Sequence, residues 1–189
     1  MRTLAKNFAV VFAVALLIQT ARAQDAPKAP LAPKAADRPS KVLLDNWNDI
    51  GRKLTAMAED FPEDKYDFKP NPAQRSFAEQ LLHVSVNLNF FIEAAKGAKP
   101  PSDIKRADFP TKAAVVDYVK KSFADGAALI KSKGDRGMSD LFADPFSNQL
   151  TRFSDGAWGS IEHAGEHYGQ LVVYYRTSGL VPPESRPKK

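Results

Sequence analysis

The stretch SIEHAGEHYGQLVVYY, residues 160–175, repeats apolar side chains at alternating steps of three and four residues. The repeated positions are Ile161, Ala164, Tyr168, Leu171 and Tyr175. An α-helix turns by about 100° per residue, so this spacing places the five side chains on one face and predicts a helix that buries it. The same stretch contains His163 and His167, two of the three histidines in the chain. It therefore bears on both the fold and the function.

Three further stretches carry the same helical spacing, and each predicts one more buried helix face. Their apolar positions are Leu43, Trp47, Ile50, Leu54 and Met57 in the first stretch, Phe77, Leu81, Val84, Leu88, Phe91 and Ala95 in the second, and Val116, Val119, Phe123 and Ile130 in the third. No alternating apolar and polar run of strand length competes with them. Four such helices predict an all-α protein built as a four-helix bundle.

Local signals mark where these helices begin and end. Ser76 and Glu79 have the spacing of a capping box at the start of the second helix, and Thr111 is a candidate cap for the third. Gly97 and Gly179 are expected to end the second and fourth helices. The connections span roughly residues 60–75, 97–110 and 134–152. They are long for a simple up-and-down bundle, so their lengths do not predict the direction of each helix.

The first 23 residues are predicted to be an export signal. Arg2 and Lys6 give a basic start, and Phe8–Ile18 is an unbroken apolar run that is short for a membrane span. The small residues around Arg22 fit cleavage after Ala23. We therefore expect a mature protein in the periplasm, with no membrane segment after cleavage.

The segment after the signal, residues 24–40, is rich in Ala, Pro and Lys and is predicted to be a disordered linker. The folded domain is then expected to cover residues 41–187. Because nothing in the linker repeats an apolar face, we place the whole bundle, and any site, in this single domain.

Charge and cysteine content exclude several function classes. The chain has 27 basic and 22 acidic residues, and removal of residues 1–23 lowers its net charge from +5 to +2. The basic residues are scattered, so we expect no nucleic-acid partner. The chain contains no cysteine. Disulfides and a thiol nucleophile are therefore excluded, and a hydrophobic core must hold the domain together.

The histidines have a spacing that suits a metal ion. His163 and His167 lie within roughly 40° of each other, one turn apart on one helix face. They lie about 120° from the predicted buried face of their helix, and His83 makes a similar angle with that of the second helix. We thus expect all three beside the buried faces, with Gly159 and Gly156 leaving room for a ligand before His163. Spacing alone predicts a two-histidine half-site and leaves open that these are ordinary helix histidines.

One interpretation of the motif is that the protein is a peptidase, because His163, Glu166 and His167 form the H-x-x-E-H pattern of inverzincins. That class takes its third zinc ligand from a glutamate far downstream. Only 22 residues follow His167, and Glu184 is the sole acidic residue among them. The third ligand that a peptidase needs is therefore absent, and we favour the other readings.

Two longer stretches together resemble the DinB-like superfamily of metal-binding four-helix bundles (DinB/YfiT-like). They are FPEDKYDFKPNPAQRSFAEQLLHV at residues 61–84 and HAGEHYGQLVVYYRTSGLVPPESR at residues 163–186. The resemblance extends from about Val42 to Arg186. It implies that His83, His163 and His167 bind a divalent metal ion, zinc or nickel, and it is compatible with a homodimer.

The resemblance implies a metal-dependent hydrolase or a thiol-dependent transferase that acts on an unknown small-molecule substrate. Three imidazoles leave coordination positions open, where a metal can lower the pKa of bound water to about 7. Glu166 is a candidate catalytic base. Glu79, one turn before His83, is a candidate hydrogen-bond partner of His83, in addition to its role in the capping box. Two alternatives stay open: a non-catalytic metal-binding or stress-related bundle, and a bundle without metal.

Overall fold

The structure is a computed structural model that describes residues 38–102 and 104–187. The predicted export signal, residues 1–23, and the linker up to residue 37 lie outside the described residues. Within the described ranges, no helix combines the length and the apolar character needed to cross a membrane.

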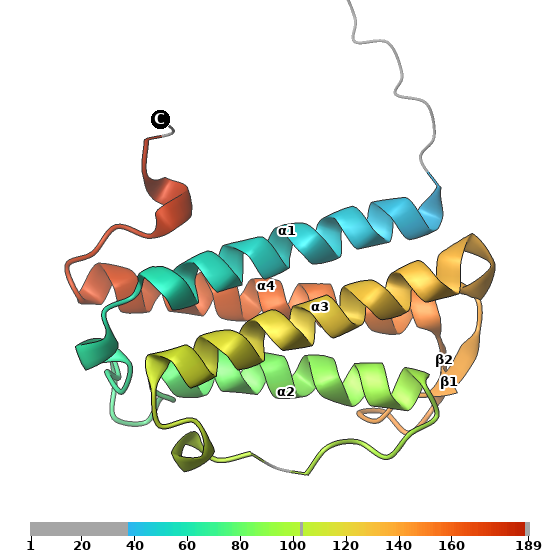
Figure 1. The fold of residues 1–189 in the computed structure, drawn as a ribbon, viewed down its shortest axis with the longest axis horizontal. Helices are drawn as coiled ribbons and strands as arrows, with labels where there is room; N and C mark the ends of the chain where they lie inside the picture. The colour runs from blue at the N-terminus through green and yellow to red at the C-terminus, as the bar shows by residue number, and fades with distance from the viewer. Residues whose placement is uncertain (1–37, 103, 188–189) are drawn as a thin grey trace, which may run out of the picture. The chain divides into compact units, whose positions relative to one another are not determined.

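Four long helices pack as a bundle, which confirms the predicted fold (Figure 1). They are α1 (Pro39–Asp60), α2 (Phe77–Ala95), α3 (Lys112–Gly137) and α4 (Phe153–Thr177). The pairs in extensive contact are α1 with α3, α2 with α3, α2 with α4, and α1 with α4. Helices α2 and α4, which carry the histidines, are therefore direct neighbours.

The four helices do not simply alternate in direction. Figure 1 shows α1 and α4 running one way and α2 and α3 running the other. Ser40 Oγ at the start of α1 donates a 2.6 Å hydrogen bond to Asp135 near the end of α3, so these two helices are antiparallel. The rings of Phe61 and Tyr175, near the ends of α1 and α4, lie 4.9 Å apart, so these two are parallel. The α2–α3 connection must therefore return along the bundle.

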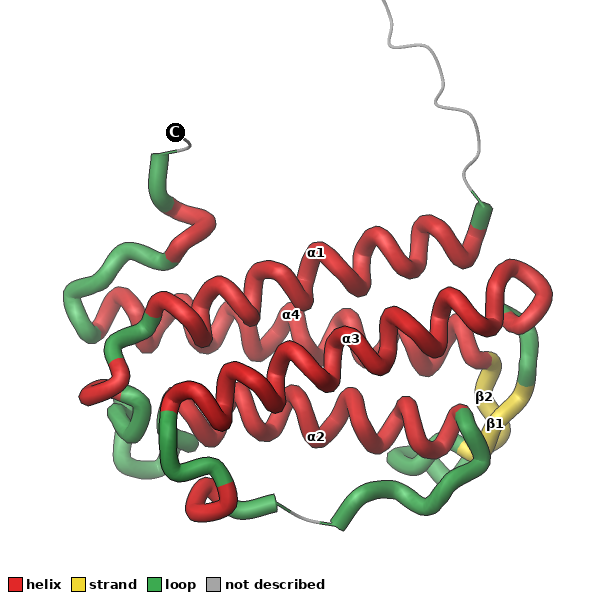
Figure 2. The backbone as a smooth tube through the Cα atoms, in the orientation of Figure 1, coloured by secondary structure: helices red, strands yellow, loops and turns green. Residues whose placement is uncertain are grey.

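The connections and the segment after α4 contain short elements that the sequence patterns did not predict (Figure 2). They are the 3-10 turns η1 (Glu63–Lys65), η2 (Arg106–Asp108) and η3 (Pro183–Ser185), and the strands β1 (Leu141–Ala143) and β2 (Leu150–Arg152). The two strands pair antiparallel, with Phe142 opposite Thr151. Strands of three residues are too short to show an alternating pattern, which is why the all-α prediction omits this hairpin.

The predicted helix ends are confirmed. Ser76 Oγ accepts a hydrogen bond from Glu79 N, and the Glu79 carboxylate accepts one from Ser76 N, which completes the capping box of α2. Thr111 Oγ1 accepts from Ala114 N at the start of α3. Gly97 and Gly179 follow α2 and α4 with φ of 71° and 73°, a left-handed conformation that glycine adopts without strain.

Close contact between α1 and α3 depends on a glycine. Trp47 is fully buried, and its Nε1 donates a 2.9 Å hydrogen bond to the carbonyl oxygen of Phe123. A Cβ on Gly126 would lie 2.0 Å from Trp47 Cζ2, so only glycine fits at this position. The indole thus fills the space that a side chain on α3 would otherwise occupy.

The predicted buried faces of α1 and α3 are buried as a whole, and that of α2 is buried except for Ala95. The buried face of α4 differs from the prediction. It contains Phe153, Ala157, Ser160, Ala164, His167, Leu171, Tyr174 and Tyr175. Ile161 and Tyr168 lie only half-buried at its edge. The expectation that His167 lies beside the buried face is therefore wrong, because the buried sector of α4 is shifted from the predicted face towards Ser160, His167 and Tyr174.

Candidate metal centre

The three histidines meet between α2 and α4. His83 extends from α2, and His163 and His167 extend from α4 one turn apart. Their ring centroids are separated by 5.2 Å for His83 and His163, 4.8 Å for His83 and His167, and 4.5 Å for His163 and His167. One nitrogen from each ring lies within 4.8 Å of the other two, an arrangement that can hold a metal ion. Metal ligation by these residues stays a prediction.

Two buried nitrogens of the cluster have no hydrogen-bond partner among the described residues. They are Nε2 of His163 and Nδ1 of His167, and the His167 side chain is only 5% exposed. Buried polar atoms are rarely left unpaired in proteins, because the loss of their hydration costs free energy. Imidazole nitrogens are common ligands of divalent transition metals. The donor set therefore fits a metal ion.

Burial keeps the three imidazoles neutral. It lowers the pKa of His83 to about 4, and the positive charge of Arg75 adds to this effect. Burial likewise lowers the pKa of His167 to about 4, assisted by the two neighbouring histidines and Arg75. The pKa of His163 is lowered by burial as well, although the charge of Glu166 opposes the shift. Neutral imidazoles have the free lone pairs that metal binding needs.

The two predicted carboxylates occupy different surroundings. Glu166 is exposed and close enough to His163 for its charge to act on the pKa of that histidine. Glu79 accepts hydrogen bonds at the start of α2 and pairs with Lys69 at 3.4 Å. Within the described ranges, neither carboxylate bonds to a histidine. The capping role of Glu79 is thus confirmed, whereas His83 donates no hydrogen bond to Glu79 in the described part of the chain.

A polar group next to the histidines was missed as a unit by the sequence patterns. Gln80 Nε2 donates to Gln170 Oε1 at 2.8 Å and to Tyr174 Oη at 3.4 Å. Tyr174 Oη donates a 2.5 Å hydrogen bond to the carbonyl oxygen of Arg75. Gln80 lies three residues before His83, and Gln170 three after His167, so helical spacing relative to the histidines was the available signal.

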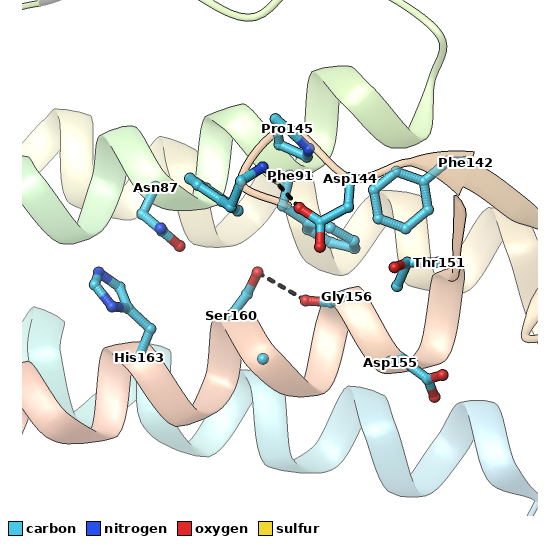
Figure 3. Close-up of a pocket in the computed structure, with 12 residues that line it drawn as sticks. Asn87, Phe91, Phe142, Asp144, Pro145, Thr151, Asp155, Gly156, Ser160 and His163 are labelled. Carbon is cyan, nitrogen blue, oxygen red and sulfur yellow. Dashed lines mark hydrogen bonds between the residues drawn. The ribbon is translucent and has the colours of Figure 1, made fainter. Parts of the chain in front are cut away.

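A cavity of about 230 Å³ opens beside His163, between α2, α4 and the segment that contains the β1–β2 hairpin. Figure 3 shows Asn87 and His163 approaching each other from opposite walls, with Phe91 and Phe142 farther along.

The two glycines that precede His163 differ in the space beside them. Gly159 lines the cavity, and a Cβ there would meet no atom within 4 Å, as expected for a position that leaves room for a ligand. Gly156 was expected to leave room as well, but a Cβ there would lie 2.6 Å from Phe142 Cζ. The ring of Phe142 already fills that space, so only Gly159 has open space beside it.

Comparisons with known proteins give one family and one fold. The family model described as the DinB superfamily matches residues 47–171. A DinB-like protein from Bacillus cereus is similar in structure, with a TM-score of 0.64 and 18% identity over 76% of this chain and 95% of that chain. A DinB-like protein from Bacillus subtilis has a TM-score of 0.61 and 18% identity over 78% of this chain and 99% of that chain.

A conserved protein from Enterococcus faecalis has a TM-score of 0.59 and 14% identity, over 73% of this chain and 95% of that chain. At these identities the likeness concerns the fold alone. No curated protein matches the chain.

Proposed function

This chain belongs to the DinB superfamily, and we propose that it binds a divalent metal ion through His83, His163 and His167 and serves as a metal-dependent hydrolase or transferase. The observation that carries the proposal is the pair of buried nitrogens on His163 and His167 that have no hydrogen-bond partner in the described part of the chain. A bound ion would satisfy both. Zinc and nickel are the ions that we expect, because imidazole ligands suit both.

The surroundings of the cluster support a reaction at the metal. When bound, such an ion would act as a Lewis acid on water, a thiolate or a carbonyl group. Three protein ligands leave room for one more, which is typical of catalytic zinc sites. The cavity beside His163 offers space for a small molecule, and the Asn87 amide can hydrogen-bond its polar groups. Glu166 is the candidate base because it is exposed and close to His163.

Elemental analysis of the purified protein after reconstitution with zinc or nickel tests the metal directly. We expect about one metal ion per chain, and its loss in His83→Ala, His163→Ala and His167→Ala variants. The matched control is Glu166→Gln, which alters the H-x-x-E-H pattern and should keep the metal. Less than about a tenth of an equivalent in the wild-type protein would refute the proposal.

The reaction is tested by a screen of the metal-loaded protein against hydrolase substrates and electrophiles offered with low-molecular-weight thiols. Activity should disappear on chelation and return with the metal. If Glu166 is the base, Glu166→Gln will lower the turnover number while metal content stays unchanged. A metal-loaded protein that is inactive across the whole screen would contradict catalysis.

A non-catalytic metal protein is the second candidate, and the origin of the ligands favours it. His83 comes from α2 and the other two histidines from α4, so a metal ion would cross-link neighbouring helices. If the metal is only structural, we expect it to exchange slowly and to carry no exchangeable water. Water relaxation measurements on the manganese- or nickel-loaded protein distinguish the candidates, because a catalytic site must exchange its water rapidly.

We also propose that the protein is exported to the periplasm, on the basis of the sequence of residues 1–23. The apolar run and the small residues before the expected cleavage point support this proposal. Mass spectrometry of the protein recovered from a periplasmic extract should show a chain that begins at Gln24. An uncleaved chain retained in the cytoplasm would contradict export.

A further inference from the structure

A groove with four basic side chains in its walls reaches the histidine cluster at His83. Its walls include Lys69, Arg75, Lys105 and Arg106, and Glu79 is the only acidic residue among the described residues that line it. The 230 Å³ cavity borders the cluster at His163. No lysine or arginine is among the described residues that line it. The candidate metal centre thus borders two depressions of different chemistry.

Two of the four cations in the groove are already paired. Lys69 lies 3.4 Å from Glu79, and Arg106 lies 2.8 Å from Asp67. Arg75 and Lys105 form no ion pair in the described part of the chain. Unpaired cations that share one groove produce a positive potential, which attracts anions.

The backbone of Arg75 is held by α4. Its carbonyl oxygen accepts the 2.5 Å hydrogen bond from Tyr174 Oη, and Tyr174 is only 1% exposed. After burial, the charge of Arg75 contributes to the lowered pKa of each of the three histidines. The guanidinium therefore acts electrostatically on the whole cluster, while its side chain stays exposed to ligands in the groove.

We propose that this groove binds an anionic group, a carboxylate or a phosphate, of the substrate whose reacting group lies at the metal. The inference rests on the proposed function and narrows its substrate class to small anions. Arg75 supplies the planar pair of donors that suits two oxygens of such a group, and Lys105 supplies a second positive charge. The rest of the substrate meets the apolar rings of Phe91 and Phe142 in the cavity.

Three probes that share one aromatic ring test the inference: benzoate, phenyl phosphate and the neutral benzamide. Their dissociation constants are measured by ligand-detected NMR with the full chain, both metal-free and zinc-loaded. We expect at least one of the two anions to bind the metal-free protein about tenfold more tightly than benzamide. The comparison of benzoate with phenyl phosphate identifies which anionic group the groove prefers.

Variants assign the binding to the groove. Arg75→Gln should weaken binding of the preferred anion by about fivefold in the metal-free protein, and Arg75→Lys should restore part of it. Lys131→Gln removes one positive charge on α3, at a depression shared with Arg38 and Ser40, and should leave binding unchanged. The zinc content of all three variants should equal that of the wild type.

The outcomes separate the two proposals. Equal binding of benzamide and both anions, or unchanged binding in Arg75→Gln, would overturn the anion groove even if zinc binds stoichiometrically. A protein that takes up no zinc but binds an anion through Arg75 would refute the proposed metal function and support the groove.

Discussion

The rings of His83 and His167 lie 4.8 Å apart across the contact between α2 and α4, with their planes at 70°. Neither ring donates or accepts a hydrogen bond within the described ranges. Buried nitrogens of His167 and of the neighbouring His163 have no hydrogen-bond partner in the described part of the chain, which lowers stability unless something binds them. The metal-free protein should therefore have a lower free energy of unfolding than the metal-bound protein.

Metal binding should raise the stability of the bundle. At free zinc of 100 times the dissociation constant, mass action stabilises the folded state by about 2.7 kcal/mol. For a chain of this size, that gain raises Tm by about 5–10 °C. Differential scanning calorimetry of the chelated protein, before and after addition of zinc, measures the shift.

The matched control for this prediction is His167→Gln, which keeps a polar side chain of similar size but removes a ligand nitrogen. Zinc should raise the Tm of this variant by much less than that of the wild type. The prediction fails if zinc leaves the wild-type Tm unchanged or raises both values equally.

The stability of the metal-free protein should depend on pH between about 4 and 6.5. The pKa of His83 and His167 is about 4 in the folded protein, against an ordinary value of 6.5 in the unfolded chain. In this window the unfolded chain binds more protons than the folded one, so the free energy of unfolding rises with pH. The stability that the two neutral imidazoles contribute is fully present above pH 6.5 and is lost as the pH falls towards 4.

We expect a loss on the order of 1–3 kcal/mol between pH 7 and pH 4.5, measured by urea unfolding of the chelated protein. Asp60 does not account for it, because the neighbouring Arg186 lowers the pKa of that carboxyl below 3.8. A His83→Gln, His167→Gln double variant should show a flatter dependence. An equally steep dependence in the double variant would show that other groups cause it.

The fold followed from local patterns wherever large apolar residues make up the buried side of a helix. The apolar repeat from Leu43 to Met57 identified the buried side of α1 correctly, and Ser76 with Glu79 identified the start of α2. The repeat in α4 was less informative, because alanines, serine and histidine share its buried sector with the large apolar residues. Small and polar residues do not contribute to an apolar repeat, so the strongest apolar repeat need not mark the centre of a buried sector that contains them.

The site was predictable only in part, because its assembly depends on the packing of one helix against another. The i and i+4 spacing placed His163 and His167 together, but their approach to His83 depends on how α4 packs against α2. Spacing within one helix carries no information on that packing. Phe142 and Arg75 lie in connections, and tertiary contacts bring them to the site. No local pattern marked either of them.

The close approach of α1 and α3 predicts a large effect of a small substitution. Gly126→Ala places a methyl group 2.0 Å from Trp47 Cζ2, so the helices must move apart or the indole must leave its position. We expect a loss of about 1–3 kcal/mol in the free energy of unfolding, measured by urea denaturation.

Gly169→Ala is the matched control, because a Cβ at this position in α4 meets no atom within 4 Å. That change should stabilise the protein by about 0.5–1 kcal/mol, since alanine favours the helix. Equal effects of the two substitutions would contradict the tight contact at Trp47.

The cavity beside His163 predicts a variant that separates substrate access from metal binding. Gly159 lines the cavity and has open space where a side chain would begin, so Gly159→Leu should narrow the cavity without disturbing the core. Its zinc content and Tm should stay close to those of the wild type, while kcat/KM on any substrate found in the screen falls by about tenfold or more. Gly159→Ala should have a smaller effect, because its methyl group fills little of the 230 Å³. If Gly159→Leu keeps full activity with its metal bound, the substrate reaches the metal by another route, and the groove beside His83 becomes the entrance to test.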